Sequence, residues 1–132
     1  MCWAERLENV NIQIADKDIE VYKVVYKANK KSCKSCVRGF MYEANTLYKM
    51  PSIEPIKSYI TYSDISIIYI REAYHSYTKI QPTLSNQLRA IRSDNPYYVA
   101  TFVIPKGATY IINTKGEIVS DKIIYTGRYL KL

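Results

Sequence analysis

The chain has 132 residues, of which 48% are hydrophobic and 23% charged, and its formal net charge is +7. This length suits a single domain, residues 1–132, with a buried core of its own. No stretch is long and apolar enough to span a bilayer, and MCWAERLENV lacks the basic and apolar regions of a secretory signal. We therefore expect a cytoplasmic protein without a membrane partner, located in the host cytoplasm if the source is a virus.

The first strong pattern in chain order follows a short turn of helix that we expect within AERLENV, residues 4–10. Residues 19–28, IEVYKVVYKA, alternate with period two and predict a strand. One face carries the odd-numbered residues, including Lys23 and Lys27, and the other carries the even-numbered ones. We expect the even-numbered face to pack on the core, because the odd-numbered face bears the lysines. NKKSCKS, which follows at residues 29–35, is predicted to be a polar, basic loop.

The three cysteines, Cys2, Cys33 and Cys36, are an odd number in a chain with no sign of secretion, which argues against a disulfide framework. Cys33 and Cys36 have the spacing of a zinc knuckle, but a tetrahedral zinc site needs four ligands. Only Cys2 and the sole histidine, His75, are left to complete such a site. We expect reduced thiols in the basic loop, no bound metal and no cofactor.

The middle of the chain predicts several short strands. VRGFMYEANTLYKM, residues 37–50, indicates two extended segments on either side of residues 43–45. After the proline-bounded PSIEP, residues 56–78 are rich in β-branched and aromatic side chains and predict two or three strands. Asp64 and Ser66 are the expected interruption.

The last third of the chain predicts one main helix and a central strand. In residues 83–93, TLSNQLRAIRS, leucine and isoleucine recur on one helical face. Residues 97–104, YYVATFVI, are apolar on both faces, which is typical of a strand inside a sheet. Pro105 should end that strand, because proline has no N–H to donate, and Gly107 permits the turn that follows. Further strands are expected over 108–113 and 121–125, around a turn at 114–116.

Together these elements predict a mostly β, α+β domain with antiparallel or mixed twisted sheets and one main helix. Two compositional features bear on function. Fourteen tyrosines against two phenylalanines supply rings for sheet edges or for stacking on a ligand. Between Val21 and Tyr42 the chain has six basic residues and no acidic one, a local excess that favours phosphate-bearing partners or forms a solvated surface. These six are Lys23, Lys27, Lys30, Lys31, Lys34 and Arg38.

The segments VYKV, VRGFMYEANTLYKM, AYHSYTK, YYVATFVIPKGATYI and GEIVSDKIIY resemble a family of uncharacterised small proteins from phages and gut Bacteroides. That family has an early Tyr-Lys strand and then the pattern GF-x-YE-x-x-x-x-Y. A strand with Phe-His-Ser follows, then IPKG and a late GE-x-x-S-x-K-I. The resemblance covers most of residues 19–125 and implies no established activity. Ala73 departs from it, because the family has glycine before the aromatic residue.

A fainter resemblance is to the ADP-ribosyltransferases, which use NAD. It places Tyr22-Lys23 at the first motif of that family, residues 74–78 at the second and Glu117 at the catalytic carboxylate. The arginine or histidine that grips NAD in the first motif is absent here unless Lys23 replaces it. The resemblance implies His75 and Tyr77 at the nicotinamide, with Glu117 and His75 as the catalytic candidates.

Three functions follow as hypotheses. The first is a non-enzymatic phage accessory protein that binds and sequesters a phosphate-bearing nucleotide or a nucleotide-derived immune signal. The second is the NAD-using transferase, and the third is a protein inhibitor or interaction module that uses an exposed sheet edge. RNA or DNA stays open as a partner on charge alone, and a homo-oligomer is compatible with each hypothesis. For the first, the candidate ligand-binding residues are Lys23, Lys27, Arg38, His75, Tyr77 and Lys106.

Overall fold

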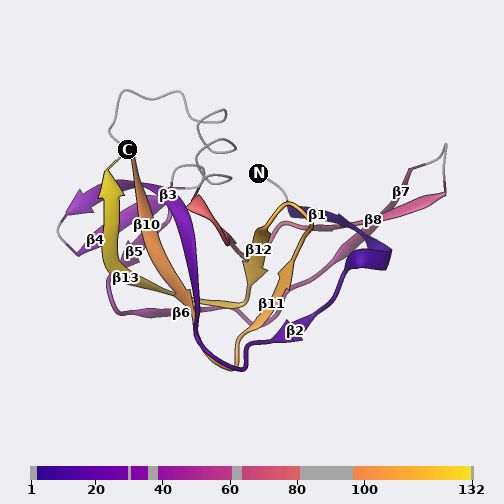
Figure 1. Ribbon diagram of the computed structural model, residues 1–132, viewed down its shortest axis with the longest axis horizontal. Helices are drawn as coiled ribbons and strands as arrows, with labels where there is room; N and C mark the ends of the chain where they lie inside the picture. The colour runs from indigo at the N-terminus through magenta and orange to yellow at the C-terminus, as the bar shows by residue number, and fades with distance from the viewer. Residues whose placement is uncertain (1–2, 30, 36–38, 61–63, 81–96, 132) are drawn as a thin grey trace.

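The computed structural model describes residues 3–29, 31–35, 39–60, 64–80 and 97–131, and these residues form a strand-dominated fold (Figure 1). A short 3-10 helix, η1, spans Leu7–Asn9. The strands in chain order are β1 (Trp3–Arg6), β2 (Gln13–Ile14), β3 (Ile19–Asn29), β4 (Ser32–Ser35), β5 (Met41–Glu43), β6 (Leu47–Lys49), β7 (Ile56–Ile60), β8 (Ile65–Ile70), β9 (Tyr74–Tyr77), β10 (Tyr97–Ile104), β11 (Thr109–Ile112), β12 (Glu117–Ser120) and β13 (Lys122–Lys131).

The strands form two sheets whose ladders are antiparallel. The smaller sheet has the order β1-β8-β7, and its β7–β8 hairpin extends away from the rest of the molecule in Figure 1. The larger sheet runs β2-β11-β12-β9-β3-β10-β13-β6, with β4 paired to both β3 and β5. The predicted β-rich class with antiparallel sheets is therefore confirmed. The helix predicted over 83–93 lies outside the described residues.

Five strands of the larger sheet connect in a closed ring: β3, β4, β5, β13 and β10. The contact that closes it joins the end of β5 to β13, where Ala44 forms a parallel bridge with Tyr125. The backbone N–H of Asn45 also donates to the carbonyl of Tyr125 at 2.7 Å. This ring encloses the main hydrophobic core, which we call the ring core.

The ring core takes its residues from two parts of the chain that lie far apart in sequence. Its buried members are Val21, Val25, Cys33, Tyr42, Ala100, Phe102, Ile104, Ala108, Ile118, Ile123 and Tyr125. A second core lies against the smaller sheet and consists of Trp3, Ile68, Ile70, Ile111 and Val119. Neighbouring residues of β12, Ile118 and Val119, belong to different cores, because successive side chains in a strand point to opposite faces. We call the strip β11–β12–β9, which separates the two cores, the central strip.

The strand predicted over 97–104 is confirmed as β10, and it is central because β3 and β13 pair with its two edges. Pro105 ends it as expected. The turn that follows is held by the N–H of Ala108, which donates to Pro105 O at 3.0 Å, and Gly107 adopts a φ of 90°. The predicted turn at 114–116 also forms, with Gly116 at a φ of 78°.

Both faces of β3 carry buried residues, including Val24 on the even-numbered face, but the ring core lies on the face opposite to the one predicted. Val21 and Val25, on the odd-numbered face, are fully buried in the ring core, and Lys23 lies between them. Glu20, on the even-numbered face, is exposed. A lysine stem is apolar over most of its length, so it can line a core while its ammonium finds polar partners.

Two further expectations are corrected. Residues 32–35 were predicted to lie in a basic loop, but they form β4, where Cys33 is buried in the ring core. Ser32 is buried beside it, whereas Lys34 is exposed, and the segment pairs with both β3 and β5. The helical turn expected at residues 4–10 is reduced to η1, because Trp3–Arg6 pair with β8 as strand β1. Within the ranges described, no helix is long and apolar enough to cross a membrane.

Candidate functional site

Lys23 of β3 is the candidate residue with the most unusual surroundings. Its side chain is half-buried on the ring-core face, and its ammonium donates a hydrogen bond to the backbone carbonyl of His75 on β9. The same nitrogen lies 5.5 Å from the ring centroid of Tyr42 and 5.8 Å from that of Phe102. These are cation–π distances, and such contacts strengthen as water is removed. The positive charge of Lys23 is therefore held against two aromatic side chains within the closed ring of strands.

The aromatic side chains around Lys23 continue from the core to the surface. Phe102 contacts Tyr125 and Tyr42, with centroids 5.1 and 4.9 Å apart. Tyr42 in turn contacts Tyr48 at 5.3 Å and Phe40 at 4.8 Å. Phe40 is 45% exposed, whereas Phe102 is fully buried. We call Phe40, Tyr42, Tyr48, Phe102 and Tyr125 the aromatic cluster; it links the ammonium of the half-buried Lys23 to the exposed ring of Phe40.

The tyrosines of this region keep their hydroxyl protons. Burial raises the pKa of Tyr42 far above its ordinary value, and the nearby Tyr74 and Cys33 add to the shift. Burial also raises the pKa of Tyr125, to about 12, and that of Tyr74. At neutral pH these hydroxyls are thus uncharged, so the tyrosines add hydrogen-bonding capacity without negative charge.

Sequence reasoning identified Lys23 but not the aromatic cluster. The signal was present in the pattern GF-x-YE-x-x-x-x-Y, which is filled here by Phe40, Tyr42 and Tyr48. The spacing brings them together because β5 and β6 lie on either side of the residues that close the ring. Phe102 and Lys23 join them from distant parts of the sequence through the β3–β10 ladder.

His75, Tyr77 and Glu117 lie on the central strip, on the opposite face of β9 from the ring core. Tyr77 is directly opposite Glu117 in the β9–β12 ladder, and His75 is opposite Val119, a member of the second core. Nε2 of His75 lies 3.1 Å from the carbonyl oxygen of Arg71. The structure thus brings these three residues onto one face, whereas Lys23, on the ring-core face, donates to the backbone carbonyl of His75.

The side chain of Glu117 takes part in the hairpin between β11 and β12. Its Oε1 accepts a hydrogen bond from Nδ2 of Asn113 at 3.0 Å, while Oδ1 of Asn113 accepts from the N–H groups of Lys115 and Glu117. The carbonyl of Glu117 accepts from Nε1 of Trp3 at 3.0 Å. These contacts give Glu117 a role in holding the turn and the N-terminal strand in place.

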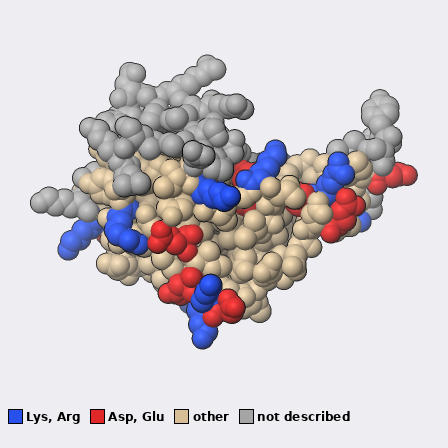
Figure 2. Space-filling model, viewed as in Figure 1, with Lys and Arg blue, Asp and Glu red and all other residues tan. Residues whose placement is uncertain are grey.

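The remaining candidates are dispersed. Lys106 lies in the turn after β10; its side chain is exposed, and its backbone N–H donates to Oδ1 of Asp18 at 2.9 Å. Lys27 pairs with Cys33 in the β3–β4 ladder. Arg38 lies outside the described residues. The face in Figure 2 shows Lys and Arg interspersed with Asp and Glu, so the described side chains on that face do not form a surface of one sign.

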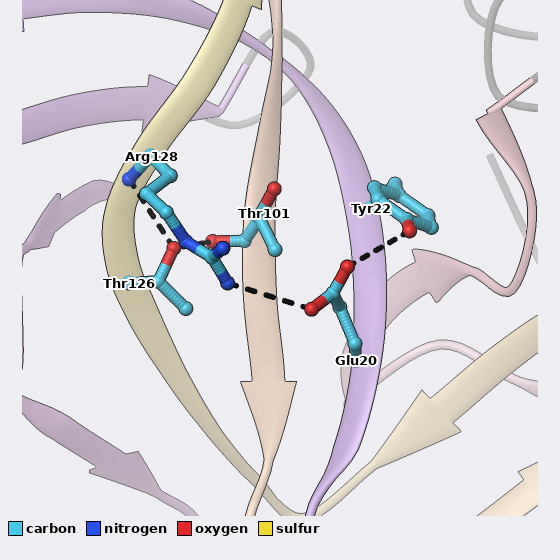
Figure 3. Close-up of polar contacts among 5 residues, drawn as sticks. All are labelled: Glu20, Tyr22, Thr101, Thr126 and Arg128. Atoms are coloured by element: carbon cyan, nitrogen blue, oxygen red, sulfur yellow. Dashed lines mark hydrogen bonds and ion pairs between the residues drawn. The ribbon is translucent and has the colours of Figure 1, made fainter.

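The outer face of β3, β10 and β13 has a polar network of its own (Figure 3). Glu20 accepts a hydrogen bond from the hydroxyl of Tyr22 at 2.9 Å. It also forms an ion pair with Arg128, at 3.4 Å. The hydrogen bond to Glu20 raises the pKa of Tyr22. Tyr22 and Lys23, neighbours in sequence, therefore act on opposite faces of the sheet.

Within the part of the chain that the structure describes, no three His, Cys, Asp or Glu side chains gather as metal ligands do. Cys33 is buried and reduced, and Cys2 and Cys36 lie outside the described ranges. Comparison with known protein families, with curated proteins and with solved structures finds no match.

Proposed function

We propose that the protein binds a nucleotide or nucleotide-derived signal at Lys23 and the aromatic cluster, without breaking a bond. The observation that carries this proposal is the ammonium of Lys23 held against Tyr42 and Phe102. A nucleotide joins a flat aromatic base to an anionic phosphate. It therefore matches a site that combines exposed aromatic surface with a charge fixed close by.

In this binding mode the phosphate approaches Lys23 and the base stacks on the exposed part of the aromatic cluster. Phe40, at 45% exposure, has ring surface available, and Tyr48 lies edge-on to it at 5.5 Å. Stacking of one base on an aromatic side chain is worth about 1–3 kcal/mol. A hydrogen bond to a charged group adds about 1.5–3 kcal/mol.

The resemblance to small phage proteins gives the proposal a biological setting. A non-enzymatic protein that holds a host's nucleotide-derived immune signal would lower the free concentration of that signal. Such a protein needs affinity and copy number but no catalytic residues. This role is consistent with a site made of one lysine and several aromatic rings.

The test is calorimetric titration of the protein with the four ribonucleoside monophosphates, with NAD and with cyclic dinucleotides. We expect at least one to bind, and Lys23→Met to abolish that binding, since methionine keeps much of the stem and loses the charge. Lys17→Met is the matched control, because Lys17 is an exposed lysine before β3. Absence of binding by the whole panel, or full binding by Lys23→Met, contradicts the proposal.

The same panel separates binding from catalysis. Ligand released by heating should be chemically unchanged. The pairing of Glu117 with Tyr77 on the face that holds His75 is the observation that favours the NAD-using alternative. If the wild-type protein turns over NAD and Glu117→Gln does not, the function is group transfer from NAD and not binding alone.

A second candidate function is recognition of another protein through β2. Among the described strands it forms one end of the larger sheet, and Ile12 and Ile14 beside its outer edge are 59% and 71% exposed. Open edges with exposed apolar residues accept further strands. A purified complex that persists after nuclease treatment and is lost in Ile14→Lys would support this function; nucleotide binding should then be unaffected by the substitution.

A further inference from the structure

Ser76 on β9 carries a buried hydroxyl with no hydrogen-bond partner among the described residues. Its side chain is 1% exposed, and its Oγ is one of two such atoms; the other is Oγ of Ser32. Native proteins leave few buried polar atoms unpaired, because the group loses its hydration and gains nothing in return. Ser76 differs from Ser32 in lying beside the candidate site, where a bound ligand could supply the missing partner.

The hydroxyl lies on the same face as the ammonium of Lys23. Tyr22 is the antiparallel partner of Tyr77, so the next pair in that register joins Lys23 to Ser76. Ser76 is also opposite Ile118, which belongs to the ring core. The ammonium of Lys23 already contacts the carbonyl of His75, the residue that precedes Ser76. The cation and the unpaired hydroxyl are thus neighbours across the junction of β3 and β9.

We propose that Lys23 and Ser76 form an anion subsite that receives a phosphate oxygen of the ligand, with the Ser76 hydroxyl as a hydrogen-bond donor. This inference rests on the proposed nucleotide-binding function and names the part of the ligand that the junction recognises. An ammonium supplies charge but little direction, whereas a hydroxyl fixed on a strand supplies a directed donor. Together they favour a phosphate over a neutral group of similar size.

The subsite explains why the hydroxyl is retained in an apolar setting. Tyr74, two residues before Ser76 on the same face of β9, packs against the ring core, and Ile118 is fully buried. Alanine would fill the position of Ser76 without an unpaired atom. A serine there costs stability in the ligand-free protein and gains its partner when the anion binds.

The experiment compares Ser76→Ala with the wild type by calorimetric titration of adenosine 5′-monophosphate, adenosine and inorganic phosphate. We expect Ser76→Ala to weaken binding of the monophosphate by about 10- to 100-fold, as for loss of a hydrogen bond to a charged group. Adenosine should bind both proteins equally. The melting temperature of the ligand-free variant should be equal to or higher than that of the wild type.

Ser32→Ala is the matched control, because it removes the other unpaired buried hydroxyl, which lies opposite Asn29 at the far end of β3. It should leave phosphate and nucleotide binding unchanged. If the wild type binds the monophosphate and Ser76→Ala binds it equally well, the subsite is wrong and the proposed function stands. If phosphate alone binds in a Ser76-dependent way while no nucleotide binds, the subsite stands and the proposed function fails. If neither phosphate nor nucleotide binds, both are overturned.

Discussion

Glu5 shows how a single buried carboxylate joins two parts of the fold. It lies on β1 and is 8% exposed; its Oε2 accepts the N–H of Thr114 at 2.6 Å and its Oε1 that of Arg6 at 2.8 Å. Burial alone would raise the pKa of Glu5, but the hydrogen bonds from these N–H groups outweigh it and hold the pKa below 4.5. The ionised form is therefore the one that stabilises the attachment of β1 to the β11–β12 turn.

This lowered pKa predicts a pH-dependent contribution to stability. A carboxyl group whose pKa is lower in the folded state contributes fully above its unfolded value, and the contribution is lost as the pH falls through the folded value. Glu5→Gln should lower the free energy of unfolding by about 1 kcal/mol at neutral pH and by less at about pH 3, because the contribution declines as the pH falls toward the lowered folded-state pKa. Urea unfolding at the two pH values measures this. Glu8→Gln is the control, because Glu8 is exposed and its ion pair with Arg6 is long, at 3.8 Å.

At the scale of elements, two turns contain glycine at positive φ but differ in the space around it. Gly107 has a φ of 90° and would place a Cβ in open space, whereas Gly116 has a φ of 78° and its Cβ would lie 3.0 Å from Oγ1 of Thr78. Thr78 ties β9 to that turn, since its N–H and its Oγ1 both donate to Gly116 O. The two turns therefore form a natural pair for comparison.

We predict that Gly107→Ala lowers the free energy of unfolding by about 1 kcal/mol, the cost of the backbone conformation alone. Gly116→Ala should cost about twice as much or more, because Thr78 must also move away from the new methyl group. Chemical denaturation of both variants checks the difference. Equal losses would mean that the turn at Gly116 relaxes without disturbing β9.

The sequence predicted the elements better than it predicted their faces. The run at residues 97–104, Pro105 and the turn glycines are local signals, and each led to the right strand or turn. The core face of β3 was missed because Lys23 looks solvent-exposed in sequence, and its aromatic partners come from β5 and β10. Ser76 was overlooked for the same reason: nothing local shows that its hydroxyl lies beside Lys23. Only the strand order, which is set by distant pairings, places them together.

At the scale of the whole molecule, the central strip makes the two cores depend on each other. Ile118 packs in the ring core and Val119 in the second core. If β12 detaches, both cores therefore become exposed to solvent. Trp3 reinforces the link, because its ring is buried in the second core and its Nε1 bonds to the backbone of β12. We therefore expect the described strands to unfold as one unit.

Trp3 provides the probe for that expectation, since it is the single tryptophan of the chain. Its fluorescence reports on the second core, and the near-ultraviolet circular dichroism of the tyrosines includes the signals of Tyr42 and Tyr125 in the ring core. The two urea transitions should have the same midpoint, and Ile70→Ala should lower both together by an amount equivalent to about 2–5 kcal/mol. A tryptophan transition at lower urea than the tyrosine transition would show that the smaller sheet unfolds separately.

The ring closure between Ala44 and Tyr125 has a consequence for synthesis of the protein. β13 follows every other strand in the chain, yet it pairs with β10 and completes the wall around residues that were translated much earlier. Until β13 leaves the ribosome, Val21, Val25 and Tyr42 lack that cover. Non-local pairings of this kind form slowly, and nascent chains with uncovered apolar strands are prone to aggregate. The newly made chain should therefore depend on chaperones until β13 has been synthesised and has paired with β10.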